Sequence, residues 1–183
     1  MHLNNLRAYT YVEDFDANLI NNLSKNVSII YRNYKETNID HILKIKKLCK
    51  KNKIKFFISN NIKLAIKLNA DGAYIPAFNR SFSHNSYTFK KKFKLIGSAH
   101  NLTEIRIKEK QGASSIFLSS IFQNKKSNKF LGIYRFFTLM KLTTKNVVCL
   151  GGINKNNIKK IKLLKKNHIA SISMIKKLTK NHE

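Results

Sequence analysis

The sequence predicts an α/β fold, specifically a compact single-domain (β/α)8 TIM barrel with short helices. Two observations predict it: short apolar runs recur along the chain, and amphipathic stretches with apolar residues at helical spacing separate them. A third concerns size, because 183 residues with 43% apolar content suit one domain with its own core. One proline and six glycines leave no linker that would divide the chain, so residues 1–183 are expected to form one domain.

Eight short runs rich in Ile, Val, Phe and Tyr have the length of strands that are buried on both faces. They lie at Ala8–Val12, Val27–Tyr31, Lys55–Ser59, Ala73–Ile75, Lys94–Ala99, Ser115–Ser119, Val147–Leu150 and Ile169–Met174. Eight strands with helical segments between them are the count of a (β/α)8 barrel. That fold typically uses about 250 residues, so the helices must be short.

Helices are expected between these runs. Residues 39–49 repeat apolar side chains at helical spacing with lysines on the other face, and Asn38, Asn101 and Asn154 supply N-cap side chains. A doubly wound open sheet is the alternative for the same alternation. It usually carries a glycine-rich phosphate loop after its first strand, whereas Thr10–Asp16 contains no glycine. This absence favours the barrel.

The chain is strongly basic, with 36 Lys+Arg against 9 Asp+Glu and a formal net charge of +27. Such an imbalance suggests an anionic partner: nucleic acid, an acidic membrane face or a phosphorylated small molecule. Only five of the basic residues are Arg, the side chain that reads bases and clamps phosphates, so nucleic acid ranks last. Lys, Asn and Ile share AT-rich codons. Genome composition therefore explains most of the lysines, and no binding partner is needed to account for them.

The cysteine count and the apolar segments predict a compartment. Cys49 and Cys149 are too far apart for a paired-cysteine metal motif, and two cysteines in this length predict a reducing environment with buried thiols. Residues 1–12 lack a signal pattern, and no uncharged apolar run approaches the roughly 20 residues that span a bilayer. The expectation is a cytoplasmic protein without a membrane partner.

Two loops suggest a phosphate site, because barrels of this kind often bind phosphate after strands seven and eight. Gly151 and Gly152 follow the seventh run, and glycines let an anion approach backbone amides. Ser173 and Met174 end the eighth run, where their amides and the Ser173 hydroxyl would face the same place. A tight turn with a helix cap is the alternative interpretation of the glycines.

Several motifs together resemble thiamine-phosphate synthase and its relative, the thiazole tautomerase, over roughly residues 27–176. They are Ile58–Asn61, Ala70–Gly72, Ile96–His100, Gly112–Ala113, Ile121–Phe122, Val147–Ile153 and Ile169–Ile175. The resemblance implies a compact (β/α)8 barrel. It also implies one of two reactions: synthases join a hydroxymethylpyrimidine diphosphate to a thiazole phosphate with magnesium, and tautomerases rearrange the thiazole phosphate precursor.

The sequence departs from the synthase pattern at its charged positions. The Gln-x-Arg-x-Lys triplet of the resemblance matches Ile30, Arg32 and Tyr34, so only Arg32 remains to bind a diphosphate. The two magnesium aspartates match Asn60 and Asn79, whose amide oxygens carry no charge for a cation. The expectation is therefore no metal held by the protein, with any Mg²⁺ carried by the diphosphate substrate.

Further residues match the catalytic positions of the resemblance. His100, two residues after Ser98, fits the tautomerase Ser-x-His pattern, and an imidazole exchanges protons near neutral pH. Ser98 is the matching substrate contact. Lys125 or Lys126 fits the lysine-bearing loop after the sixth strand, where an ammonium would neutralise a phosphate or a leaving pyrophosphate.

Three functions remain open on the sequence alone. The first is an enzyme of thiamine biosynthesis, either a divergent synthase or a tautomerase-like isomerase. The second is a non-catalytic protein that binds a thiazole or thiamine phosphate through its glycine loop. The third, placed last, is a barrel that binds nucleic acid through its net charge of +27, and would lose affinity steeply with salt.

Overall fold

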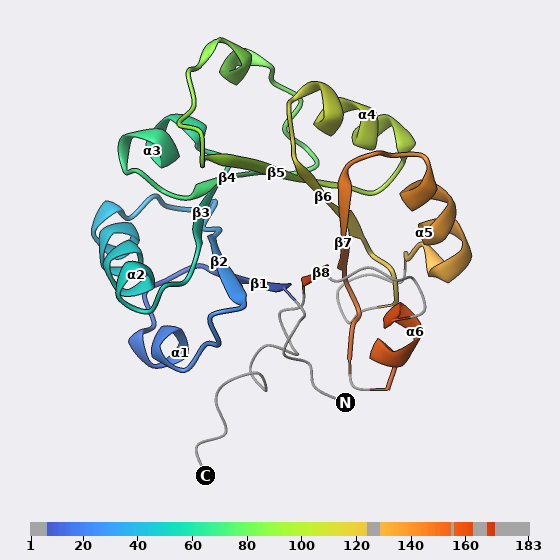
Figure 1. Ribbon diagram of the computed structural model, residues 1–183, viewed down its shortest axis with the longest axis horizontal. Helices are drawn as coiled ribbons and strands as arrows, with labels where there is room; N and C mark the ends of the chain where they lie inside the picture. The colour runs from blue at the N-terminus through green and yellow to red at the C-terminus, as the bar shows by residue number, and fades with distance from the viewer. Residues whose placement is uncertain (1–6, 124–128, 155, 163–167, 171–183) are drawn as a thin grey trace.

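The computed structural model describes residues 7–123, 129–154, 156–162 and 168–170. Eight parallel strands and the helices between them follow one another along the chain (Figure 1). The strands are β1 (Arg7–Val12), β2 (Val27–Tyr31), β3 (Phe56–Ser59), β4 (Gly72–Ile75), β5 (Lys94–Ala99), β6 (Ser115–Ser119), β7 (Asn146–Leu150) and β8 (His168–Ala170). The helices are α1 (Ala17–Asn21), α2 (Ile39–Lys51), α3 (Ile62–Lys67), α4 (Leu102–Lys110), α5 (Gly132–Lys141) and α6 (Ile158–Lys162).

The sheet is parallel and curled. Each strand from β1 to β7 pairs with the next one along the chain. The short β8 pairs with both β7 and β1, so the strand order returns to its start. Figure 1 shows the helices on the outside of this curled sheet. The predicted α/β class with a TIM-like parallel sheet is confirmed. The last predicted strand, Ile169–Met174, lies within the described residues only as far as Ala170.

One connection differs from the predicted alternation of strand and helix. Between β4 and β5 the structure has a single 3-10 turn, η2 (Ser83–Ser86), in place of an α-helix. The segment is rich in Ser and Asn, whose side chains bond locally and compete with helical hydrogen bonds. Thus Asn79 Oδ1 accepts from the Ser81 amide at 2.9 Å.

The interior of the curled sheet is filled by side chains, most of them large. The buried residues of this cluster come from strands β1 to β7: Tyr11, Ile30, Phe57, Tyr74, Ile96, Phe117 and Val148. Tyr74 and Phe117 meet edge to face with ring centroids 5.4 Å apart, a favoured aromatic geometry. The outward-facing residues of the strands form two further clusters under the helices. Both faces of the strands are buried, as the near-continuous apolar runs predict.

The predicted helix caps are confirmed in two of three places. Asn38 and Asn101 lie at the starts of α2 and α4. The side chain of each accepts a hydrogen bond from the backbone amide three residues further along the chain. The prediction for Asn154 was wrong by one turn, because α6 begins at Ile158. Asn154 Oδ1 instead accepts from the amide of Asn157 and forms a turn before the helix.

The predictions about the cysteines and about membrane-spanning segments can be compared with the structure. Both cysteines are buried, as predicted, and burial raises the pKa of the Cys49 thiol to about 12. Within the described ranges, no helix combines the length and the apolar character needed to cross a membrane.

Candidate active site

The described candidate residues gather at the carboxyl edge of the sheet, where barrels of this kind place their chemistry. They follow or end successive strands: Arg32 after β2, Asn60 after β3, Asn79 after β4, Ser98 and His100 at the end of β5, and Gly151 and Gly152 after β7. The remaining candidates, Lys125, Lys126, Ser173 and Met174, lie outside the described residues.

Asn60 and Asn79 form a direct amide–amide contact, called here the amide pair. Asn79 Nδ2 donates to Asn60 Oδ1 at 2.7 Å. The orientation of the Asn79 amide is fixed because its Oδ1 accepts from the Ser81 backbone at 2.9 Å. Asn60 has a positive φ of 58°, a conformation that asparagine tolerates better than most residues. The loops after β3 and β4 are thus joined by a neutral hydrogen bond.

Arg32 lies over a buried aromatic ring instead of extending freely into water. Its guanidinium carbon is 4.1 Å from the ring centroid of Tyr11, within the range of a cation–π contact. The Tyr11 hydroxyl donates to the Tyr74 hydroxyl at 3.2 Å, and Tyr74 is in turn hydrogen-bonded to Ser98. Burial raises the pKa of Tyr11 well above its ordinary value, so this phenol stays neutral. Two predicted site residues, Arg32 and Ser98, are therefore linked through two tyrosines.

His100 is paired with an acidic residue of α4. Its Nδ1 lies 2.8 Å from Glu104 Oε2, and its backbone amide donates to the same oxygen at 2.7 Å. The carboxylate is held by a capping arrangement, because Asn101 Oδ1 accepts from the Glu104 amide and Asn101 Nδ2 donates back to Oε1. A carboxylate beside Nδ1 favours the tautomer with the proton on that nitrogen, which leaves Nε2 as an acceptor when the ring is neutral.

The two glycines after β7 are required by close packing. Both have positive φ values, 95° at Gly151 and 67° at Gly152. A Cβ at Gly151 would overlap the Ser120 side chain, and one at Gly152 would overlap the Phe122 carbonyl. The loop after β7 therefore packs against the loop after β6. The glycines are thus needed for packing, in addition to the role in anion binding that the sequence suggests for them. The phosphate site itself stays a prediction.

Three acidic residues at the same edge were overlooked by the sequence reasoning. Glu13, Asp14 and Asp16 follow β1 directly, and their position after the first strand was the available signal. Asp16 caps α1, and Asp14 lies 3.6 Å from His41 Nδ1. Among the described residues, no three His, Cys, Asp or Glu side chains gather as a potential metal site.

A buried lysine fixes the loop that carries Asn79. Lys108 of α4 is fully buried, and its ammonium donates to the Asn79 carbonyl at 2.6 Å and to Gln111 Oε1 at 2.9 Å. Gln111 Nε2 adds a bond to the Ser81 carbonyl at 2.7 Å. Gly97 makes room for this side chain, because a Cβ there would come within 2.8 Å of Lys108 Cδ. α4 thereby holds the loop after β4, which has no α-helix of its own.

We expect Lys108→Met to lower the free energy of unfolding by about 2–3 kcal/mol, because two buried acceptors lose their donor. Burial lowers the pKa of Lys108 from 10.5 to about 8. Between these values the unfolded chain binds a proton that the folded chain does not, so the stabilisation by Lys108 grows as the pH rises from 8 toward 10.5. Urea unfolding should therefore show a larger loss in the variant at pH 10 than at pH 7.

The matched control is Lys110→Met, an exposed position on the same helix, which should change the free energy of unfolding by less than about 0.5 kcal/mol. An equal loss at both pH values in Lys108→Met would show that burial does not shift the titration of this amine.

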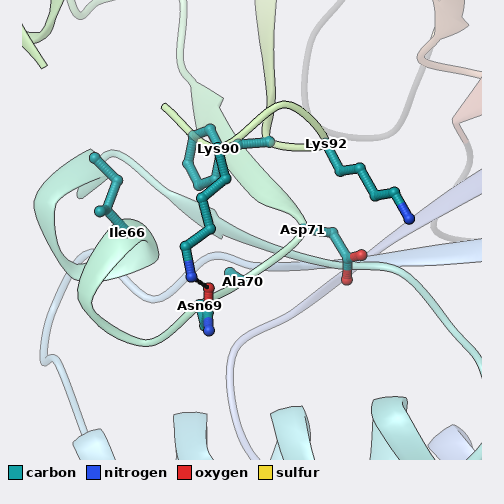
Figure 2. A pocket seen from close by; sticks show the side chains of 7 residues that line it. Ile66, Asn69, Ala70, Asp71, Lys90 and Lys92 are labelled. Carbon is teal, nitrogen blue, oxygen red and sulfur yellow. Dashed lines mark hydrogen bonds between the residues drawn. The ribbon is translucent and has the colours of Figure 1, made fainter. Parts of the chain in front are cut away.

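A small hollow of about 130 Å³ lies away from these residues (Figure 2). Asp71 precedes β4, so this hollow is at the amino edge of the sheet. Three of its polar side chains are already paired: Lys90 Nζ donates to Asn69 Oδ1 at 2.6 Å, and Asp71 Oδ2 accepts from the Phe56 amide at 2.9 Å. We do not place the candidate active site there.

Comparisons with known proteins give the family of the chain. The family model described as thiamine monophosphate synthase matches residues 15–176, a span that includes every candidate site residue. The chain belongs to the thiamine monophosphate synthase family. It is 33% identical over 155 residues to a thiamine-phosphate synthase of Pelagibacter ubique, an alignment that covers 80% of this chain and 74% of that protein.

Other members of the thiamine monophosphate synthase family are longer. A thiamine-phosphate synthase of Prochlorococcus marinus strain AS9601 is 30% identical over 167 residues, which are 86% of this chain and 46% of that protein. The chain thus spans about half the length of this relative. Among solved structures, a thiamine phosphate pyrophosphorylase from Pyrococcus furiosus superposes with a TM-score of 0.74 at 17% identity, covering 98% of this chain and 90% of that one.

The fold alone does not distinguish the family. FabK from Thermotoga maritima superposes with a TM-score of 0.71 at 11% identity, covering 93% of this chain and 59% of that chain. Because one fold can host unrelated functions, arguments about function have to rest on the site residues.

The side chains of Asn60 and Asn79, as they lie in the structure, do not fit a protein-held Mg²⁺. Magnesium is usually bound through one or two carboxylates together with substrate phosphates. Both side chains are amides, and the Asn60 oxygen already accepts a hydrogen bond from Asn79. An amide oxygen offers a cation a dipole and no negative charge.

Proposed function

We propose that the protein is a divergent thiamine-phosphate synthase that joins a hydroxymethylpyrimidine diphosphate to a thiazole phosphate. The family match over residues 15–176 carries this proposal. In this reaction a bond forms between the thiazole nitrogen and the pyrimidine methylene carbon, while the bond from that carbon to the diphosphate oxygen breaks. Inorganic pyrophosphate leaves. Formation of thiamine phosphate from the two substrates is the direct test.

The roles of the individual residues follow from the charge that develops on the leaving group. Arg32, oriented on the Tyr11 ring, would bind the diphosphate and stabilise the departing pyrophosphate. Lys125 or Lys126 would add a second cation from the loop after β6. The glycine loop (Gly151–Asn154), with Ser173 and Met174, would hold the thiazole phosphate through backbone amides.

A tautomerase-like activity is the second candidate, and the His100–Glu104 pair is the observation that favours it. A tautomerisation needs one group that removes a proton at one position and returns one at another. A His100 ring with Nδ1 held by Glu104 presents Nε2 for both steps. Displacement of a diphosphate needs no such base at the attacking nitrogen. A non-catalytic binder of thiazole phosphate is what remains if neither reaction is observed.

We also propose that residues 1–183 form one complete (β/α)8 barrel. The pairing of β8 with both β7 and β1 supports this, and so does the family match, which extends past β8 to residue 176.

The proposal predicts how synthase turnover depends on magnesium. Because Asn60 and Asn79 bond to each other, any Mg²⁺ would enter as part of the diphosphate substrate. Turnover should follow the concentration of the magnesium–diphosphate complex, with little response to additional free Mg²⁺. The double variant Asn60→Asp with Asn79→Asp should gain a saturable requirement for free Mg²⁺, measured as initial rate against free Mg²⁺ at fixed substrate.

Asn85→Asp, in the exposed η2 turn, adds a carboxylate without touching the amide pair and serves as the charge control. A tight and saturable binding of Mg²⁺ by the parent protein in the absence of diphosphate would contradict the prediction.

A further inference from the structure

The loop after β4 carries Asn79 and has little internal support of its own. Asn79 Oδ1 accepts from the Ser81 amide at 2.9 Å, and the Ser81 hydroxyl lies 3.0 Å from Ser83 Oγ, but both bonds are exposed. Hydrogen bonds in contact with water contribute little net stability, because water competes for the same groups. The loop therefore depends on contacts from outside the segment to keep Asn79 in one place.

Two buried side chains at the end of α4 supply these contacts, and we call Lys108 and Gln111 the carbonyl clamp. The Asn79 carbonyl accepts from Lys108 Nζ at 2.6 Å and from Gln111 Nε2 at 3.1 Å. The Ser81 carbonyl accepts from Gln111 Nε2 at 2.7 Å, and Lys108 Nζ also donates to Gln111 Oε1. Both clamp residues are fully buried. Movement of the loop would leave a buried ammonium short of an acceptor, so the clamp opposes it.

A buried cation is not what the packing of α4 requires. Among the described residues, Lys108 is the one Lys or Arg that is buried. Apolar side chains in place of the whole clamp would bring no charge to desolvate, and such replacements are often neutral or stabilising. They would offer no donor to the Asn79 and Ser81 carbonyls, which could then turn toward water. The clamp therefore favours one conformation of the loop.

Asn79 connects the clamp to the amide pair. Its carbonyl is bonded to Lys108 on one side, and its side chain donates to Asn60 Oδ1 at 2.7 Å on the other. The loops after β3 and β4 are thereby held relative to α4. The first turn of the same helix holds Glu104 against His100. One helix thus supports both the amide pair and the imidazole.

We infer that Lys108 and Gln111 are positioning residues of the synthase site, which hold the amide pair where the magnesium–diphosphate group of the substrate binds. The inference rests on the proposed function for the identity of that group. It goes beyond the proposed function because it gives a role in substrate binding to two residues that lie behind the loop. Loss of the clamp should weaken binding of the diphosphate and spare the thiazole phosphate, which belongs to the glycine loop.

Calorimetric titration at neutral pH with two probes tests this selectivity. Magnesium pyrophosphate represents the diphosphate group, and a thiazole phosphate reports on the glycine loop. Lys108→Met should raise the dissociation constant of magnesium pyrophosphate about tenfold and change that of the thiazole phosphate less than about twofold. Lys110→Met, an exposed position on the same helix, should change neither. Circular dichroism at the titration temperature checks that each variant is folded.

Gln111→Glu tests the clamp with the ammonium in place. The carboxylate still accepts from Lys108, but it loses the N–H groups that donate to the Asn79 and Ser81 carbonyls. Magnesium pyrophosphate binding should weaken about threefold or more, again without an effect on the thiazole phosphate. This variant keeps the inference testable if Lys108→Met does not fold.

A double-variant cycle tests whether the clamp acts through Asn79. Asn79→Ala removes the side chain that reaches Asn60 and keeps the backbone carbonyl that Lys108 binds. In this background Lys108→Met should change magnesium pyrophosphate binding less than about twofold, while its effect on the free energy of unfolding stays as in the parent. A lysine with a merely structural role would have the same effect on binding in both backgrounds.

The outcomes distinguish this inference from the proposed function. Equal weakening of both probes, unchanged binding in Lys108→Met, or a tenfold effect that persists beside Asn79→Ala overturns the positioning role even if thiamine phosphate is formed. A parent protein that does not bind magnesium pyrophosphate saturably overturns it as well. A selective, Asn79-dependent loss supports it even in a protein that turns over neither substrate, where the proposed function fails.

Discussion

Gly152→Asp is expected to abolish binding of a thiazole phosphate. The substitution adds a carboxylate where an anion would approach the backbone amides of the glycine loop. It also places a Cβ on the Phe122 carbonyl, at a residue whose φ of 67° suits glycine. Charge and packing act in the same direction, so no saturable binding should be detected by calorimetry.

Because Gly152→Asp changes packing as well as charge, a second variant isolates the charge. Asn154→Asp is isosteric, and its side chain keeps accepting from the amides of Asn156 and Asn157. The folded loop should be unchanged, as circular dichroism and the unfolding midpoint would show. The added negative charge should still weaken binding of a thiazole phosphate about tenfold.

Unchanged affinity in Gly152→Asp would place the phosphate elsewhere in the protein. Unchanged affinity in Asn154→Asp, together with loss in Gly152→Asp, would show that the glycines matter for packing against the β6 loop and not for the anion.

The order of the strands was predictable because each is buried on both faces and therefore shows as an uninterrupted apolar run. Val27–Tyr31 and Lys94–Ala99 have the predicted bounds to the residue. The caps at Asn38 and Asn101 were predictable for a similar reason, since the interaction is local in sequence. Local signals of this kind predict that a residue lies at the carboxyl edge of the sheet. They do not predict which side chains it contacts there.

The partners were not predictable because they depend on contacts between distant segments. Nothing in the sequence distinguishes Lys108 from the many exposed lysines, and only the space left by Gly97 allows its burial. The cation–π contact of Arg32 with Tyr11 joins a residue that follows β2 to a residue of β1. The bonds from Lys108 and Gln111 that support the β4–β5 connection also come from outside the segment.

His100→Asn and Arg32→Ala are expected to have opposite effects on the two candidate reactions. Tautomerisation depends on proton transfer, so His100→Asn should lower its turnover about 100-fold or more while changing synthase turnover less than about threefold. Synthase turnover depends on charge neutralisation at the leaving diphosphate, so Arg32→Ala should lower it by a similar factor and leave tautomerisation nearly intact. Steady-state rates of both variants with both substrates are the measurement.

Glu104→Gln tests whether the carboxylate acts through the imidazole. Its side chain retains the size of the glutamate but loses the charge that faces His100 Nδ1 at 2.8 Å. If Glu104 positions and polarises the ring, the pH profile of tautomerase turnover should shift in this variant while synthase turnover keeps the parent profile. Both catalytic assignments would be contradicted if the parent protein turned over neither substrate but still bound a thiazole phosphate. Arg32 and His100 would then have no reaction to support, and only the phosphate-binding function would remain.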